Sequence, residues 1–483
     1  MVKTKLVATV GPACSSDEMI GRFIDAGVNV FRLNFSHGTL DDHQASLDRI
    51  RRMATRRQAM IAVLGDLCGP KIRLGRIAGG RCELQPGREI TFQRQPTEGT
   101  PQRLWCRYPA LIDDVEVGHR VLIDDGSILL RATRKQADEL ICECEIGGTI
   151  SDHKGINLPD SKVSAPSLTD KDLADLDWVI RHELDLVALS FVRRPDDLRR
   201  LREVLDSHGS RIRTIAKIEK PEALDHLDAI IQLADGVMVA RGDLGVEMDL
   251  ARVPIVQKEI ALHCQRSGKP VIIATQMLQS MINSPVPTRA EVSDVANAIL
   301  DRADAVMLSG ETAVGRYPVE AATHIRRIAE QTERFTNRFG DELGTNRGAN
   351  VPVASAILRG TSVVAADLEP PVVAVWTLSG QTAILLSKHR LAAPIVALAA
   401  DEGICRQLAF CYGVIPIFLP RADDFQAQLR QLDELLVRRG LARTEDQILI
   451  VGDTHPDIPG ETDTLLIHVV GSSTETTAAP RGA

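Results

Sequence analysis

Aromatic residues are scarce in this chain of 483 residues. It contains ten Phe, three Tyr and three Trp, although hydrophobic residues make up 44% of the sequence and charged residues 25%. The overall hydrophobic and charged fractions are ordinary for a globular protein. The cores must therefore be built from aliphatic side chains, as the cores of buried parallel sheets usually are.

Long apolar runs and basic stretches are also absent. No run reaches the roughly 18 apolar residues that a membrane-spanning helix needs, so no transmembrane segment is expected. Lys and Arg number 57 against 65 Asp and Glu, a net charge of −8. This balance argues against a nucleic acid or an anionic membrane as the partner. Residues 1–11 lack a signal-peptide pattern, which favours a cytoplasmic location.

The nine cysteines are odd in number and scattered along the chain. Cys142 and Cys144 are the closest pair, and neither a second pair nor a histidine completes a zinc-ligand spacing. We expect all nine to be reduced thiols, as in a reducing cytoplasm.

Short apolar runs alternate with amphipathic, helix-like segments over the first 340 residues. Eight such strands, most of them followed by a helix, predict a (β/α)8 TIM barrel. The predicted strands span residues 5–10, 28–35, 61–67, 186–192, 213–218, 236–240, 271–275 and 305–308.

Two further segments depart from this rhythm. Residues 72–157 show strand-like alternation and a hairpin signal at Asp125-Gly126, which predicts a small β-barrel inserted after the third strand, where it could act as a lid. Five more predicted strands, at 372–376, 395–398, 414–418, 448–451 and 465–470, indicate an open, doubly wound α/β domain. The predicted division is a barrel (1–71 and 158–340), a lid (72–157), a C-terminal regulatory domain (351–471) and a disordered tail (472–483).

Polar residues cluster at the carboxyl ends of six of the predicted barrel strands, the end of a barrel where active sites lie. They are Arg32, Asn34, Ser36 and His37 at the end of the second strand; Asp66, Lys71 and Arg73 at the third; Lys217 and Glu219 at the fifth; Arg241 and Asp243 at the sixth; Thr275 and Gln276 at the seventh; and Ser309 and Glu311 at the eighth.

Glu219 and Asp243 are carboxylates without nearby His or Cys, a donor set that suits Mg²⁺ or Mn²⁺. The alternative is that they are salt-bridged acids, with Glu219 pairing with Lys217. Several cations surround them, and a cation clamp with Mg²⁺ is what phosphoryl transfer requires. No Walker loop or kinase glycine-rich loop occurs.

Six segments carry a family resemblance: FRLNFSHG (31–38), AKIEKPEAL (216–224), MVARGDLGVE (238–247), ATQMLQSM (274–281), PTRAEVSDVANA (287–298) and VMLSGETA (306–313). Together they resemble pyruvate kinases over nearly the whole chain. The resemblance implies an enzyme of the last step of glycolysis that transfers a phosphoryl group from phosphoenolpyruvate to ADP, giving pyruvate and ATP. It also implies a homotetramer with residues 287–298 in a subunit contact.

The resemblance assigns roles to residues one by one. Lys217 would stabilise the transferring phosphoryl group, Arg32 would contact phosphate, and Thr275 would lie near the site of enolate protonation. The remaining assignments are Glu219 and Asp243 for Mg²⁺; Gly242, Asp243 and Thr275 for the substrate carboxylate; Asn34, His37, Arg73 and Lys154 for the nucleotide; and Asn34, Ser36 and Asp66 for a monovalent cation.

Lys71 departs from the pattern, because many relatives carry Glu there and resemble the potassium-dependent type. A tethered ammonium could supply the charge of the ion, so we expect no requirement for K⁺. The alternative is that Lys71 is a solvated surface lysine. Cys68, close to Asp66, could be an oxidation-sensitive thiol or a buried, inert one.

The C-terminal domain resembles the family's allosteric domain. Thr377, Ser379, Gly380 and Thr382 match a loop that receives the phosphate of an effector, here a sugar phosphate or a nucleotide. An ordinary turn with Ser and Thr caps is the alternative. The segment 452–462 would face this loop. Two other functions remain open at this stage: a Mg²⁺-dependent barrel lyase that acts on an oxo-acid enolate, and a catalytically silent sensor of phosphorylated ligands.

Overall fold

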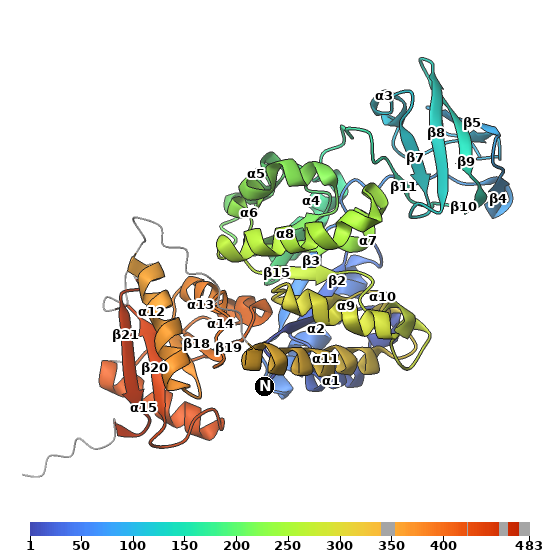
Figure 1. Cartoon of the computed structure of the whole chain (residues 1–483). Helices are drawn as coiled ribbons and strands as arrows, with labels where there is room; N and C mark the ends of the chain where they lie inside the picture. The colour runs from blue at the N-terminus through green and yellow to red at the C-terminus, as the bar shows by residue number, and fades with distance from the viewer. Residues whose placement is uncertain (340–352, 423, 454–461, 473–483) are drawn as a thin grey trace, which may run out of the picture.

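The computed structural model describes residues 1–339, 353–422, 424–453 and 462–472. A central barrel separates a smaller β unit from a C-terminal α/β unit, and the two lie on different sides of it (Figure 1). The predicted tail at 472–483 lies almost entirely outside the described residues, as does most of the predicted 452–462 segment. The division into domains at the boundaries given above stays a prediction.

Eight parallel strands close into a barrel in the order β1-β16-β15-β14-β13-β12-β3-β2. Each coincides with a predicted strand; three have the predicted bounds, and the other five are one to three residues shorter. The strands are β1 (Lys5–Thr9), β2 (Val30–Asn34), β3 (Ala62–Asp66), β12 (Leu186–Leu189), β13 (Arg213–Ile218), β14 (Gly236–Ala240), β15 (Val271–Ala274) and β16 (Ala305–Leu308).

Helices surround the barrel and bury one apolar face against it. They are α1 (Asp17–Ala26), α2 (Leu40–Arg56), α4 (Asp170–Arg181), α5 (Pro195–Ser207), α6 (Leu227–Leu233), α7 (Arg241–Glu247), α8 (Val253–Arg266), α9 (Arg289–Leu300), α10 (Gly310–Ala313) and α11 (Pro318–Phe339). Three of them begin with a reciprocal capping box, which satisfies two backbone N–H groups at the helix start. These pairs are Thr39 with Asp42, Thr169 with Asp172, and Thr288 with Glu291.

The segment between β3 and α4 is rich in strands, as predicted. It contains β4 (Arg81–Leu84), β5 (Glu89–Gln93), β6 (Arg103–Leu104), α3 (Leu111–Asp114), β7 (Arg120–Ile123), β8 (Ile128–Lys135), β9 (Glu139–Ile146), β10 (Gly148–Ser151) and β11 (Ile156–Asn157). The strands form a six-stranded sheet, β11-β7-β8-β9-β5-β6, and a two-stranded one, β10-β4. The predicted small barrel is therefore present as two ladders of strands, and the edge strands β6 and β11 of the larger one are each two residues long.

The C-terminal unit is an open sheet in the order β19-β18-β17-β20-β21. Its fifth strand runs antiparallel to the fourth, whereas the others are parallel. Its elements are α12 (Val353–Leu368), β17 (Val373–Trp376), α13 (Gln381–Ser387), β18 (Ile395–Ala399), α14 (Glu402–Gln407), β19 (Val414–Phe418), α15 (Phe425–Arg438), β20 (Gln447–Gly452) and β21 (Thr464–Val469).

Short 3₁₀ helices connect several of these elements: η1 (Pro12–Cys14), η2 (Ala78–Gly80), η3 (Pro221–His226), η4 (Leu250–Arg252), η5 (Gln279–Ile282) and η6 (Leu408–Phe410). The apolar cores are aliphatic, as the composition predicted, and one of them runs from inside the barrel through Phe410 into the C-terminal sheet. No helix among the described residues is long and apolar enough to cross a membrane.

Candidate active site

Strand β13 places Lys217 and Glu219 at the mouth of the barrel. The Lys217 ammonium lies 2.9 Å from Glu219 Oε1 and 3.1 Å from Asp66 Oδ1 at the end of β3. Arg32, at the end of β2, donates from Nε to Asp66 Oδ2 at 2.6 Å. Lys217 is 8% exposed and both carboxylates are 1% exposed. The parallel strands thus bring four predicted residues into one buried charge cluster.

Neighbouring opposite charges hold Lys217 and Asp66 in their ionised states. Burial disfavours a charged ammonium, but Asp66 and Glu219 outweigh that effect and raise the pKa of Lys217. Burial likewise opposes ionisation of Asp66, yet Lys217 and Arg32 hold the pKa of that carboxyl below its usual range. Lys217 therefore remains a fixed positive charge at neutral pH.

Glu219 differs from Asp66, because a second carboxylate faces it. Burial raises the pKa of Glu219; Lys217 pulls it down, and nearby Asp243 adds to the rise. Two carboxylates that repel each other, with no imidazole or thiolate beside them, fit a hard divalent cation. The described residues contain no group of three or more His, Cys, Asp or Glu side chains placed to hold a metal.

Helix α7 begins where β14 ends and places Gly242 and Asp243 beside the cluster. Thr275 Oγ1 accepts a hydrogen bond from the Gly242 N–H at 2.7 Å, and Thr275 has a positive φ of 69°. A left-handed threonine costs backbone energy, and such residues concentrate at functional sites. The Arg241 guanidinium turns away from the cluster, since it pairs with Asp294 at 2.8 Å and donates to the Thr275 carbonyl at 3.0 Å.

The predicted nucleotide residues lie where the β unit joins the barrel. Arg73 donates to the His153 carbonyl at 3.1 Å, and Lys154 pairs with Asp124 at 2.7 Å. Burial lowers the pKa of His37, and the positive charges of Arg73, Lys71 and Arg32 lower it further. His37 therefore stays neutral at pH 7, amid three cations.

The predicted monovalent-cation residues are only partly brought together. Asn34 Oδ1 accepts a hydrogen bond from the Ser36 N–H at 3.2 Å, whereas Asp66 forms ion pairs with Arg32 and Lys217. The Lys71 side chain is exposed. Over the described parts of the chain, no carboxylate lies within ion-pair distance of its ammonium, which is therefore not bonded to Asp66.

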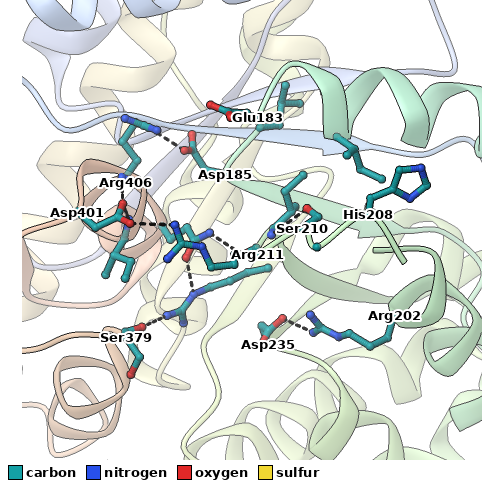
Figure 2. A pocket seen from close by; sticks show the side chains of 18 of the residues that line it. Glu183, Asp185, Arg202, His208, Ser210, Arg211, Asp235, Ser379, Asp401 and Arg406 are labelled. Carbon is teal, nitrogen blue, oxygen red and sulfur yellow. Dashed lines mark hydrogen bonds and ion pairs between the residues drawn. The ribbon is translucent and has the colours of Figure 1, made fainter. Parts of the chain in front are cut away.

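The predicted effector loop lies at the other end of the barrel. Gly380 N–H donates to Thr377 Oγ1 at 2.9 Å, Thr382 Oγ1 lies 2.8 Å from Thr462 Oγ1, and the Ser379 carbonyl accepts from Arg213 at 2.5 Å. Figure 2 shows Ser379 beside a cavity of about 660 Å³ between the barrel and the C-terminal unit.

Comparison with known proteins assigns the chain to a family. Residues 1–322 match the family model described as pyruvate kinase, barrel domain, and residues 355–468 match pyruvate kinase, alpha/beta domain. The chain belongs to the pyruvate kinase family.

Individual relatives agree with this assignment. The chain is 42% identical over 470 residues to a pyruvate kinase of Mycobacterium intracellulare, covering 97% of this chain and 98% of that one. It is 41% identical over 471 residues to one of Geobacillus stearothermophilus, covering 97% and 80%. A solved pyruvate kinase structure from Cryptosporidium parvum superimposes with a TM-score of 0.90 at 33% identity, covering 97% and 96%. The predicted fold class and the predicted phosphotransferase class are confirmed.

Sequence reasoning missed the supports of this pyruvate kinase site. Ser190, after β12, accepts from the Lys217 ammonium at 2.6 Å and donates to the Leu67 carbonyl. The Phe191 N–H donates to Glu219 Oε2 at 2.8 Å. The signal was present, because Ser190 follows the fourth barrel strand as the predicted residues follow theirs. The role of Phe191 could not be predicted from its side chain, because its backbone N–H makes the contact with Glu219.

Proposed function

We propose that the chain transfers the phosphoryl group of phosphoenolpyruvate to ADP, giving pyruvate and ATP. The observation that carries the proposal is the buried ammonium of Lys217 beside the repelling carboxylates Glu219 and Asp243. Phosphoryl transfer needs a fixed positive charge and carboxylates that can bind a divalent cation, because positioning and charge stabilisation dominate its catalysis. Both lie at one mouth of the barrel.

In the proposed reaction, the bond from phosphorus to the enol oxygen breaks as a terminal ADP oxygen bonds to phosphorus. Lys217 and Arg32 stabilise the charge on the phosphoryl oxygens. The enolate that remains takes one proton at its methylene carbon to become pyruvate. Thr275 and the Gly242 N–H hold the carboxylate end, and Thr275 lies near the protonated carbon.

Glu219 and Asp243 are the residues that would hold a divalent cation, Mg²⁺ or Mn²⁺. A bound cation would neutralise charge on the substrate oxygens and orient them. It would also relieve the repulsion between the two carboxylates. Asn34, His37, Arg73 and Lys154 would contact ADP from both sides of the junction between lid and barrel.

We propose that activity does not require K⁺. The supporting observation is that Asp66 already pairs with two permanent cations, Arg32 and Lys217, so its charge is balanced without an ion. Lys71 adds a further positive charge nearby, where it lowers the pKa of His37. Turnover should be equal in sodium, potassium and tetramethylammonium salts. A Lys71→Glu variant should gain potassium activation, and a large activation of the unaltered enzyme would contradict the proposal.

We also propose a cytoplasmic homotetramer in which loop 377–382 binds a sugar phosphate or nucleotide. Support comes from the place of this loop, whose Ser379 carbonyl bonds to Arg213 at the start of β13. Substrate saturation curves measured with a panel of sugar phosphates and AMP would reveal an effector, and mass measurement in solution would give the oligomeric state.

A coupled assay on purified protein tests the central proposal. Pyruvate and ATP should form in equal amounts from phosphoenolpyruvate and ADP, and a chelator should stop the reaction until Mg²⁺ is restored. Carbon–carbon cleavage of an oxo acid without ADP would indicate a lyase instead. Ligand binding with no turnover would indicate a silent sensor.

A further inference from the structure

Glu247, the last residue of α7, connects three segments of the molecule through one carboxylate. Its Oε1 accepts from Lys220 Nζ at 2.6 Å and from Asn157 Nδ2 at 2.8 Å. The Glu247 side chain is 1% exposed and that of Lys220 is 13% exposed. This cluster lies outside the charge cluster around Lys217 and is not used by the reaction proposed above.

Glu247 and its two partners belong to three different elements of the fold. Asn157 ends β11, the edge strand of the six-stranded lid sheet. Lys220 follows β13, the strand that carries Lys217. Glu247 itself ends α7, whose first turn contains Gly242 and Asp243. The three side chains therefore join the base of the lid, the catalytic strand and the substrate-binding helix.

The contact between lid and helix extends beyond this hydrogen bond. A methyl group built on Gly126, in the β7–β8 hairpin, would lie 3.6 Å from Val246, so the hairpin reaches the same end of α7. A small cavity of about 30 Å³ lies between them, lined in part by Asn157, Lys220 and Asp243. The lid thus meets the barrel next to the proposed cation site.

Glu247 is also incompletely satisfied. Its Oε2 is buried and has no hydrogen-bond partner among the described residues. A buried carboxylate oxygen without a donor destabilises a fold, and native proteins rarely keep one. Such a cost is expected where a side chain is held for function rather than for stability.

We propose that Glu247 is a positioning residue that sets the angle of the lid over the substrate-binding helix. This proposal rests on the proposed function, because the lid carries Arg73 and Lys154 to the nucleotide. The Asn157 hydrogen bond holds the lid to α7, and the Lys220 ion pair fixes the carboxylate that receives it. Lid placement controls phosphoryl transfer by setting the distance between ADP and phosphoenolpyruvate.

The hydrogen bond between lid and helix can be removed without touching the reacting groups. Asn157→Ala deletes the donor, and Asn157→Asp replaces it with a carboxylate of the same shape that repels Glu247. Both variants should raise the KM for ADP about tenfold, the aspartate more than the alanine, with the KM for phosphoenolpyruvate within twofold of normal. Asn283→Ala, at an exposed asparagine, is the matched control and should change neither constant.

A double-mutant cycle separates positioning from simple stability. Glu247→Gln combined with Asn157→Ala should raise the KM for ADP no more than the larger of the two single effects, since both act on one contact. Hydrogen exchange at residues 156–158 should speed up in both single variants, whereas exchange in β12 should not. Proton exchange on pyruvate, which needs no ADP transfer, should persist in Asn157→Ala.

The inference and the proposed function fail in different ways. An unaltered protein with no transfer from phosphoenolpyruvate to ADP would overturn the function and, with it, the inference. An active protein whose Asn157 variants keep both KM values within twofold would overturn the inference alone. Equal increases in both KM values would also overturn it, because Glu247 would then support only the substrate-binding helix.

Discussion

At the scale of single residues, the site depends on how firmly the Lys217 ammonium is held. Asp66 and Glu219 supply its counter-charges, and Ser190 supplies a neutral acceptor at 2.6 Å. The Ser190 hydroxyl is itself fixed by donating to the Leu67 carbonyl at 2.7 Å. The serine therefore sets the direction of the ammonium, while the carboxylates set its charge.

Ser190→Ala should lower kcat about tenfold, because the loss of a hydrogen bond to a charged group costs about 1.5 kcal/mol of positioning. The KM for phosphoenolpyruvate should change little, since Arg32 and the start of α7 remain. Steady-state kinetics check this result, with Ser207→Ala on the exposed end of α5 as control. An unchanged kcat would mean that the carboxylates alone orient Lys217.

At the scale of elements, the start of α4 fixes the loop that follows β3. Asp172 is fully buried; its Oδ2 accepts from the Thr169 N–H and hydroxyl, and its Oδ1 accepts from the Gly69 N–H at 3.0 Å. One carboxylate thus caps a helix and holds the loop that leads to Lys71.

Asp172→Ala should therefore destabilise the protein by about 2–3 kcal/mol, because it removes a helix cap and leaves the Gly69 N–H unsatisfied. Asp170→Ala, an exposed acid in the same first turn, is the control and should cost less than about 1 kcal/mol. Thermal or denaturant unfolding measures the difference. Equal losses in the two variants would show that only the helix dipole matters.

Elements were predictable from the sequence to the extent that their signal was local. All eight barrel strands are short aliphatic runs and six of them have polar residues at their carboxyl ends, so the strands, and the cluster of Arg32, Asp66, Lys217 and Glu219 at one barrel mouth, could be predicted. Thr169-x-x-Asp172 likewise has the spacing of a capping box. The bond from Asp172 to Gly69 spans 103 positions and has no local signature. The same is true of the contact between Asn157 and Glu247.

At the scale of the whole molecule, buried lysines join the barrel to the C-terminal unit. Lys5 of β1 donates to the Val414 carbonyl at 2.6 Å, and Lys388 pairs with Asp304 at 2.6 Å. Burial lowers the pKa of Lys5 to about 8. The unfolded chain holds this proton up to about pH 10.4, so it binds more protons than the folded chain between the two values.

The free energy of unfolding should therefore rise as pH increases from 8 to about 10, because deprotonated Lys5 is favoured in the folded chain. This gain should be lost again as pH falls back to about 8. Lys5→Met removes the buried charge. At pH 7 the melting temperature of this variant should therefore exceed that of the unaltered protein, and the difference between the two melting temperatures should narrow toward pH 10. Melting curves across this range test the point, with exposed Lys162→Met as control. Parallel pH profiles for Lys5→Met and the unaltered protein would contradict the assignment.

The net charge of −8 is also a property of the whole molecule, and it hides the local charge at the barrel mouth. Arg32, Lys217, Lys71 and Arg73 gather there because the ends of β2, β3 and β13 and the base of the lid converge. Composition argued against a polyanionic partner, whereas the placement of these strand ends indicated a small phosphorylated ligand.

The most direct test of the central claim compares two reactions in Lys217→Met. The account predicts that phosphoryl transfer from phosphoenolpyruvate to ADP falls by several orders of magnitude, because the fixed charge beside the transferring group is gone. Proton exchange on pyruvate should persist, since Thr275 and the start of α7 are intact. Phosphoryl transfer at the normal rate in this variant would contradict the role given to Lys217.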